Sequence, residues 1–68
     1  MKIKEIEERS GMSRANIRFY ESEGLLAPER DTNGYRDYSE LDLEALQRIK
    51  LLRTLRISLE EIKSIANG

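Results

Sequence analysis

Cysteine and histidine are both absent from this 68-residue sequence. Without cysteine the chain can form neither a disulfide nor a thiolate metal site. Without histidine it lacks the commonest metal ligand and general base. Long apolar runs are missing too, because no stretch approaches the roughly 20 residues that cross a bilayer, and charges from Lys2 to Arg9 exclude a secretory signal. We expect a cytoplasmic chain without metal, cofactor or membrane span.

Catalytic patterns are equally scarce. The four glycines are isolated, so no glycine-rich phosphate loop is present. The acidic residues lack metal-loop spacing, and most serines occupy expected helix caps rather than positions beside a general base. We predict that the chain is not an enzyme.

Charge is dense but nearly balanced, at 37% of residues with a formal net charge of −1. A net charge this close to zero argues against a nucleic-acid-binding protein. The distribution differs from the sum, because residues 13–20 contain Arg14 and Arg18 without an acid, and residues 47–56 contain four basic residues without an acid. We therefore expect a single small domain, residues 1–68, with one cationic side.

The first half of the chain has the pattern of a helix-turn-helix unit. Residues 3–9 read as a short helix, and Gly11 suits the left-handed position that ends it. Ser13 is a good N-cap for a second helix over residues 13–22. Two short helices joined by a glycine-containing turn form this unit, whose second helix enters the major groove of DNA.

A β-hairpin is predicted next, over residues 28–38. Gly24 ends the second helix, and Pro28 prevents its continuation. The turn lies at Thr32-Asn33-Gly34, where Asn-Gly supplies the two positive φ angles that a two-residue hairpin loop needs. A hairpin in this place is a wing, which commonly carries arginine and tyrosine to the DNA backbone.

Two further helices complete a mainly α, winged helix-turn-helix fold of four helices and a two-stranded hairpin. Ser39 and Asp42 form a capping box for the third helix, and Ser58 and Glu61 form one for the fourth. The expected buried positions of these two helices are Leu41, Leu43, Ala45, Leu46, Ile49 and Leu52, then Leu59, Ile62, Ile65 and Ala66.

Candidate DNA contacts lie on the second helix, the hairpin and the third helix. Arg14 and Arg18 share one side of the second helix without an acid there, although solvated arginines would look the same. Tyr20 can pack its ring in the core and point its hydroxyl at a phosphate. Asn16 either reads an adenine edge or faces solvent. The full predicted set is Ser13, Arg14, Asn16, Arg18, Phe19, Tyr20, Tyr35, Arg36, Tyr38 and Arg53.

The hairpin arginine is open to two interpretations. Arg36 either contacts phosphate or pairs with a nearby acid, and Arg30 is a weaker candidate on the entry strand. On the third helix, Lys50 and Arg53 form either a phosphate clamp or an ordinary amphipathic rim. The DNA hypothesis requires that Arg18 and Arg36 face the same side and that neither is held in an internal ion pair.

Taken together, the motifs resemble the DNA-binding domain of the MerR family of bacterial transcriptional regulators, over essentially the whole chain. The segments that carry the resemblance are Ile17-Arg18-Phe19-Tyr20-Glu21, Gly24-Leu25-Leu26-Ala27-Pro28, Asn33-Gly34-Tyr35-Arg36-Asp37-Tyr38-Ser39 and Ser58-Leu59-Glu60-Glu61-Ile62. The resemblance implies double-stranded promoter DNA as the partner. It assigns contacts to Arg18, Phe19 and Tyr20 of the second helix, to Arg36 and to Arg53.

The resemblance also implies homodimers that bend and untwist a promoter spacer, and so act on RNA polymerase indirectly. The family's long dimerisation helix and effector domain are missing, so we expect either an excised domain or a solitary one, which could be monomeric. Arg56 stands where the family has glycine, and we expect another turn geometry there. Many members have their basic residue at the position of Ala15, whereas in this chain the basic residue is Arg14, one position earlier.

Two other functions fit the same residues. An excisionase-like or recombinase-associated DNA-binding module would have the same surface. A protein-interaction module, docking through its acidic faces and fourth helix, would need no DNA at all.

Overall fold

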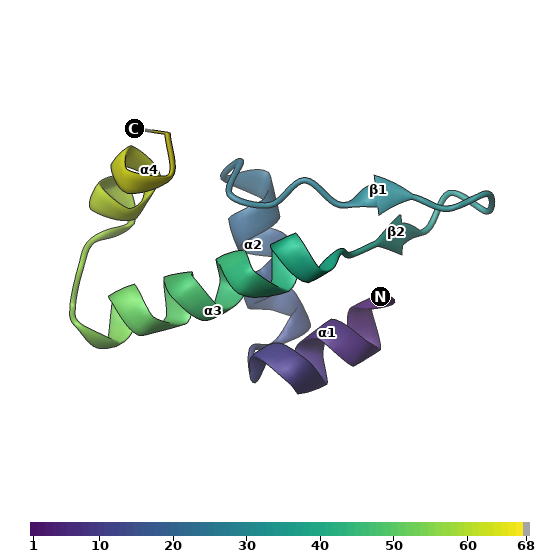
Figure 1. Cartoon of the computed structure of the whole chain (residues 1–68), viewed down its shortest axis with the longest axis horizontal. Helices are drawn as coiled ribbons and strands as arrows, with labels where there is room; N and C mark the ends of the chain where they lie inside the picture. Colours follow the sequence, from purple (N-terminus) through teal and green to yellow (C-terminus); the bar gives the residue numbers. More distant parts are fainter. Residues whose placement is uncertain (68) are drawn as a thin grey trace.

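The computed structural model describes residues 1–67 and confirms the winged helix-turn-helix fold. The chain runs through α1 (Ile3–Ser10), α2 (Arg14–Ser22), β1 (Glu29–Arg30), β2 (Arg36–Asp37), α3 (Glu40–Thr54) and α4 (Leu59–Asn67). Figure 1 shows α3 along the length of the molecule, the hairpin extending from one end and α4 at the other. Within the described residues, no helix is both long and apolar enough to cross a membrane.

Every helix and both ends of the hairpin contribute to a single core. Its nine buried side chains are Ile6, Ile17, Tyr20, Leu26, Tyr38, Leu43, Leu46, Ile49 and Ile62. Three predicted core positions are wrong, because Leu41 is 75% exposed, Ile65 is 57% exposed and Ala66 is exposed as well. The buried face of α3 is centred on Leu46, and Leu41 lies on the opposite side of that helix.

The predicted starts of α2 and α3 are confirmed, whereas the capping box predicted for α4 is incomplete. The Ser58 Oγ accepts the Glu61 N–H at 3.2 Å, but the Glu61 carboxylate accepts from the Ser58 hydroxyl, at 3.1 Å, and not from the Ser58 N–H. The Oγ atom of Ser13 accepts a hydrogen bond from the Asn16 N–H at 3.2 Å. At the start of α3, Ser39 and Asp42 exchange hydrogen bonds of 3.1 and 2.9 Å between side chain and backbone, which is a complete capping box. These caps satisfy backbone N–H groups that have no partner within the helix.

The end of α3 differs from our expectation. Arg56 has a φ of 63°, so the turn keeps the left-handed geometry that we expected it to avoid. Its N–H donates to the Arg53 carbonyl at 2.9 Å, and the Ile57 N–H donates to the Leu52 carbonyl at 3.0 Å. These two bonds form a Schellman motif, which requires a left-handed residue at the position of Arg56. The motif explains why an arginine accepts the conformation despite its steric cost.

The hairpin has a three-residue loop, not the two-residue loop that we predicted. Gly34 has a φ of 82° and Asn33 is not left-handed. Beyond the paired Arg30 and Arg36, the Asp31 N–H donates to the Tyr35 carbonyl at 2.8 Å, which leaves residues 32–34 as the loop. Asp31 organises the turn, because its Oδ1 accepts the N–H groups of Asn33 and Tyr35 at 2.8 and 3.0 Å. A turn followed by one left-handed residue is the usual form of such loops.

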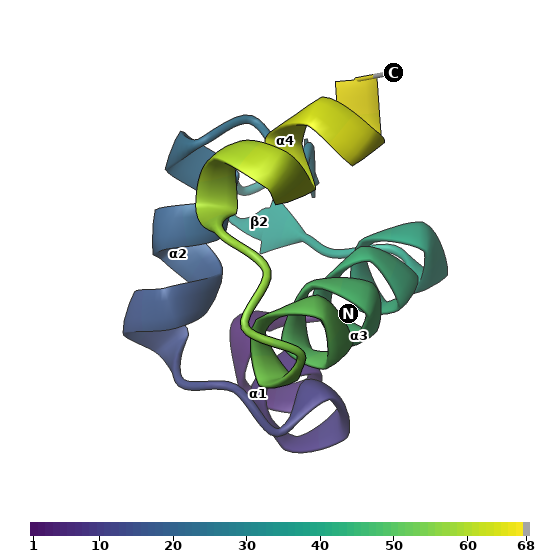
Figure 2. The same cartoon turned by 90° about the vertical axis from the view of Figure 1, so that its left-hand side faces the viewer.

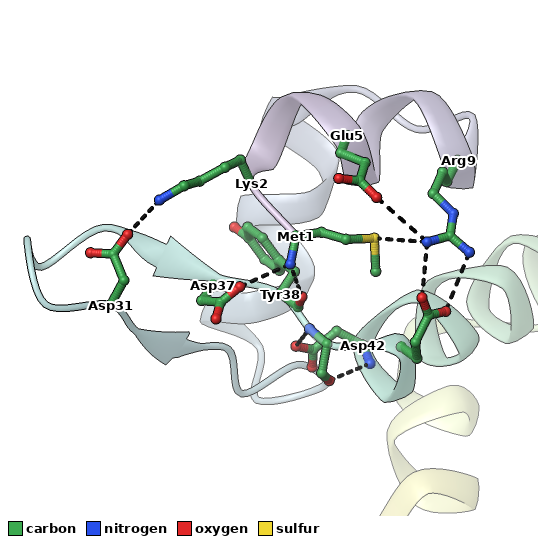
Figure 3. A network of polar contacts seen from close by, with 10 residues as sticks. Met1, Lys2, Glu5, Arg9, Asp31, Asp37, Tyr38 and Asp42 are labelled. Carbon is green, nitrogen blue, oxygen red and sulfur yellow. Dashed lines mark hydrogen bonds and ion pairs between the residues drawn. The ribbon is translucent and has the colours of Figure 1, made fainter.

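Residues at the start of the chain hold the hairpin against the helices (Figure 3). The Met1 ammonium donates to Asp37 at 2.8 Å, and the Tyr38 N–H donates to the Met1 carbonyl at 2.7 Å. Lys2 forms an ion pair with Asp31 of the turn. The position of the two-residue strands therefore depends on these contacts, because such a short hairpin is not stable by itself.

Candidate nucleic-acid interface

The outer face of α2 carries exposed side chains. Ile17 and Tyr20 are buried on its inner side, at 0% and 7% exposure. Phe19 is 45% exposed, and its ring meets that of Tyr20 edge-on at 5.3 Å. The other exposed positions at this end of the helix are Ser13, Arg14, Ala15, Asn16 and Arg18. A helix with this arrangement can present its outer side chains to a groove.

A hollow of about 470 Å³ separates α2 from the hairpin, and basic side chains line it. Arg18 comes from α2, Arg30 and Arg36 come from the two strands, and Lys2 comes from the segment before α1. The hollow confirms that Arg18 and Arg36 face the same side. Arg18 has no ion pair or hydrogen bond from its side chain to any of residues 1–67, so its charge is available to an outside anion.

Arg36 is held in an internal ion pair, so the requirement that we set for the DNA hypothesis is met by Arg18 but not by Arg36. Its Nε lies 2.8 Å from both carboxylate oxygens of Glu21. The two side chains are only 24% and 18% exposed. The two terminal nitrogens of the guanidinium have no hydrogen-bond partner within the described part of the chain. Glu21 therefore neutralises the charge of Arg36 but leaves two donor groups at the edge of the hollow.

Tyr38 lies behind this pair and is not a surface residue. It is 1% exposed, and its hydroxyl donates to Glu21 at 3.2 Å. Burial, reinforced by the neighbouring Glu21 charge, raises the pKa of Tyr38 above its usual value. We therefore correct its predicted role: Tyr38 positions Glu21 and the hairpin and does not present its side chain to a ligand.

Glu21 is the residue of this site that we did not predict. Two features of the sequence pointed to it. The alternative that Arg36 pairs with a nearby acid requires an acidic partner, and Glu21 directly follows the Arg18-Phe19-Tyr20 segment. The sequence alone did not show which of the 13 acidic residues it would be.

Arg14 also has an acidic partner that we did not expect. Glu7 of α1 lies 3.6 Å from the Arg14 Nε, and its carboxylate accepts the Arg14 backbone N–H at 3.1 Å. The Arg14 side chain is 62% exposed, so the pair is weak and open to solvent. Of the two arginines on α2, Arg18 is the unpaired one.

A second hollow, of about 510 Å³, lies on the other side of α2, towards α3. Lys50 and Arg53 of α3 line it together with Tyr20, whose ring is in the core as predicted. The Lys50 Nζ donates to the Ser10 carbonyl at 3.5 Å, and no acid pairs with Lys50 or Arg53 within residues 1–67. Ser13 and Asn16 border the same hollow. Eight of the ten predicted residues thus line two basic hollows that flank one helix, and Arg14 and Phe19 line neither.

Comparison with known proteins identifies relatives of the whole domain. The family model described as "MerR HTH family regulatory protein" matches residues 1–68. The HTH-type transcriptional regulator HmrR of Rhizobium leguminosarum bv. viciae is 45% identical over 65 residues, which cover 96% of this chain and 50% of that protein. The ZntR homolog of Haemophilus influenzae is 43% identical over 68 residues, covering 98% and 50%.

Solved structures agree with the sequence relatives. HiNmlR, a MerR family regulator lacking the sensor domain, was crystallised bound to promoter DNA. It has a TM-score of 0.92 at 34% identity, covering 98% of this chain and 52% of its own. PbrR691 of Ralstonia metallidurans CH34, in complex with lead(II), has a TM-score of 0.90 at 37% identity, covering 98% and 53%. The chain spans about half the length of the relatives that it matches.

Proposed function

This chain belongs to the MerR family of helix-turn-helix regulatory proteins, and from that premise we propose how it meets DNA. It is a DNA-binding domain of a transcriptional regulator. In our proposal α2 enters the major groove. The hairpin contacts the DNA backbone on one side of α2, and α3 contacts the backbone on the other side. The hollow between α2 and the hairpin carries the proposal, because it gathers Arg18, Arg30 and Arg36 from three elements.

The two hollows suit phosphate groups better than base edges. Arg18 and Arg30 supply unpaired charge to the first hollow, and Lys50 and Arg53 supply it to the second. Backbone contacts of this kind set position and orientation, whereas sequence is read in the groove or through DNA shape. The Arg36 guanidinium, fixed by Glu21, would donate from its terminal nitrogens to a phosphate oxygen.

Fewer side chains are placed to read bases. Asn16 and Phe19 are exposed at the N-terminal half and the middle of α2, and Ser13 and Arg14 lie beside its first turn. Asparagine can pair with adenine, and an aromatic ring can contact a thymine methyl group. Tyr35, at 67% exposure, completes the proposed contacts from the tip of the hairpin.

The wider setting is proposed by analogy with the relatives. In a bacterial cytoplasm, a longer parent protein would act as a homodimer on a promoter and affect RNA polymerase through the shape of the DNA. The relatives named above are transcriptional regulators, which favours this setting over an excisionase-like module or a protein-interaction module.

Substitution of Arg18 tests the proposal. A duplex selected in vitro from a random pool would be titrated with wild type and Arg18→Ala by fluorescence anisotropy at several salt concentrations. We expect weaker binding and a log–log salt slope smaller by about 0.9, the value for one lost phosphate contact. Arg48→Ala makes the same charge change on the outer side of α3 and should bind like wild type. Equal binding by wild type and Arg18→Ala would overturn the proposal.

A further inference from the structure

Arg14, the first residue of α2, is held by Glu7 of α1 through both its backbone and its side chain. The Glu7 carboxylate accepts the Arg14 N–H at 3.1 Å and lies 3.6 Å from the Arg14 Nε. The two terminal nitrogens of this guanidinium have no hydrogen-bond partner within residues 1–67, and the side chain is 62% exposed. Glu7 therefore holds the inner end of the guanidinium and leaves its terminal N–H groups available to a ligand.

The first turn of α2 is shaped to lie close to base edges. Figure 2 shows α2 along one outer side of the molecule, with α1 below it. Ala15 lies on the side of α2 opposite the buried Ile17 and Tyr20, because successive residues of a helix are about 100° apart. Arg14 and Asn16 flank Ala15 on either side. A single methyl group at the centre lets the helix backbone come close to the bases, so that the longer side chains beside it can reach them.

The ion pair with Glu7 makes Arg14 a poorer phosphate contact than Arg18. Arg14 lines neither basic hollow, and Glu7 offsets its charge. Arg18 lines the first hollow and has no acidic partner within the described residues. Attraction to the DNA backbone depends on uncompensated charge, so Arg14 gains little there. Its N–H groups can still donate to the uncharged oxygen and nitrogen acceptors of a base edge.

We propose that Arg14 reads a guanine in the major groove and that Glu7 is the residue that positions it. This inference rests on the proposed function, because it requires α2 to lie in that groove. Guanine presents two acceptors, O6 and N7, which match the paired N–H donors of a guanidinium. Adenine has an amino group in place of O6, and that donor would face a donor of Arg14. The first turn of α2 should therefore prefer a G·C pair.

Glu7 contributes to this preference in two ways. It restricts the rotamers of a long, flexible side chain, which lowers the entropy cost of placing the guanidinium on one base. It also opposes the alternative in which Arg14 turns to a phosphate. In Glu7→Gln the amide oxygen can still accept the Arg14 N–H, but the negative charge is gone. We expect this variant to bind DNA at least as tightly as wild type and to distinguish bases less well.

Base substitution in the bound duplex tests the assignment. In the duplex selected in vitro for wild type, each G·C pair is replaced in turn by A·T with the purine on the same strand, and fluorescence anisotropy measures affinity. We expect at least one replacement to weaken wild type about fivefold or more, the lower end for a bidentate contact, and to leave Arg14→Ala unaffected. Arg14→Ala should still respond to the other replacements. Arg14→Lys keeps the charge without the paired donors and should lose most of the preference.

Glu7→Gln should reduce the same preference, and it should have no further effect on that preference when added to Arg14→Ala. A role of Glu7 in folding alone would change affinity for every duplex alike. Glu8→Gln is the control, because Glu8 is exposed on the same helix and has no ion pair within residues 1–67. Circular dichroism checks that each variant is folded.

Arg14→Ala binding that is weaker by the same factor for every duplex, or unchanged for every duplex, would overturn the guanine assignment. A full base preference in Glu7→Gln would overturn the positioning role. Neither result would contradict the proposed function, whose failure appears instead as equal binding by wild type and Arg18→Ala.

Discussion

The Arg36 Nε lies 2.8 Å from both carboxylate oxygens of Glu21, so the ion pair joins β2 to the last turn of α2. The hairpin is only two residues long on each side and gains its position from contacts of this kind. Because Glu21 and Arg18 lie on the same helix, the pair fixes the proposed phosphate-binding arginine of the wing relative to the proposed reading helix.

Arg36→Lys should bind DNA almost as poorly as Arg36→Ala, with a loss of about five- to tenfold in affinity. Lysine keeps the charge, but its single ammonium group cannot both reach Glu21 and present two further donors to a phosphate. Anisotropy titration of the selected duplex measures the effect. Arg48→Lys is the matched control, and wild-type affinity in Arg36→Lys would show that charge alone matters.

Arg56→Gly should stabilise the domain by about 1 kcal/mol, because glycine adopts positive φ without steric cost. For a chain of this size, that gain corresponds to a rise in Tm of roughly 4–8 °C. Arg56→Ala is the control, since alanine has the same conformational penalty as arginine and should not raise the Tm. If both variants melt at the wild-type temperature, the left-handed turn stores no strain.

Asp31 should make the hairpin loop sensitive to acid. Lys2, followed by the N–H groups of Tyr35 and Asn33, lowers the pKa of this carboxyl below its usual value near 3.8. The contribution of Asp31 to stability is therefore complete above the usual pKa and is lost as the pH falls through the lowered one. NMR should show the amide signals of Asn33 and Tyr35 shifting together at that lower pH. Asp31→Asn should remove this titration, and a midpoint at or above 3.8 would contradict the assignment.

Alanine substitutions at Phe19 and Ile17 should distinguish an effect on DNA binding from an effect on folding stability. Phe19 is 45% exposed and Ile17 is fully buried, so Phe19→Ala should cost about 1 kcal/mol or less. Ile17→Ala should cost about 2–5 kcal/mol through the cavity it leaves. Thermal melts measure both changes. We expect Phe19→Ala to remain folded yet lose DNA affinity, and retained affinity would remove Phe19 from the interface.

Local signals in the sequence predicted the starts of α2 and α3 and the end of α1, although the hairpin loop and the turn at Arg56 took a geometry that we did not predict. The caps at Ser13 and Ser39 depend on side chains within three residues of the backbone groups that they satisfy. The glycine that ends α1 and the proline that follows α2 act on their own backbone in the same way. The order of the elements, and the DNA-binding fold that they form, could therefore be derived before the structure was known.

Predictions that relied on helix periodicity alone were less secure. Leu41 and Ile65 have suitable spacing for the core but lie in solvent, because spacing gives the faces of a helix without showing which face meets the domain. On α3 both faces are apolar, and only the packing against α1 and α4 decides between them.

The sequence by itself determined the elements, their caps and the family, because these follow from short-range backbone chemistry and from motifs in a fixed order. The tertiary structure decided which charges are free. Glu21 is 15 residues from Arg36, Glu7 is seven from Arg14, and Lys2 is 29 from Asp31. Partners at such separations meet only after the chain has folded. For that reason Arg18 is the unpaired arginine of the proposed reading helix within residues 1–67, and Arg36 is one that its neighbour Glu21 holds in place.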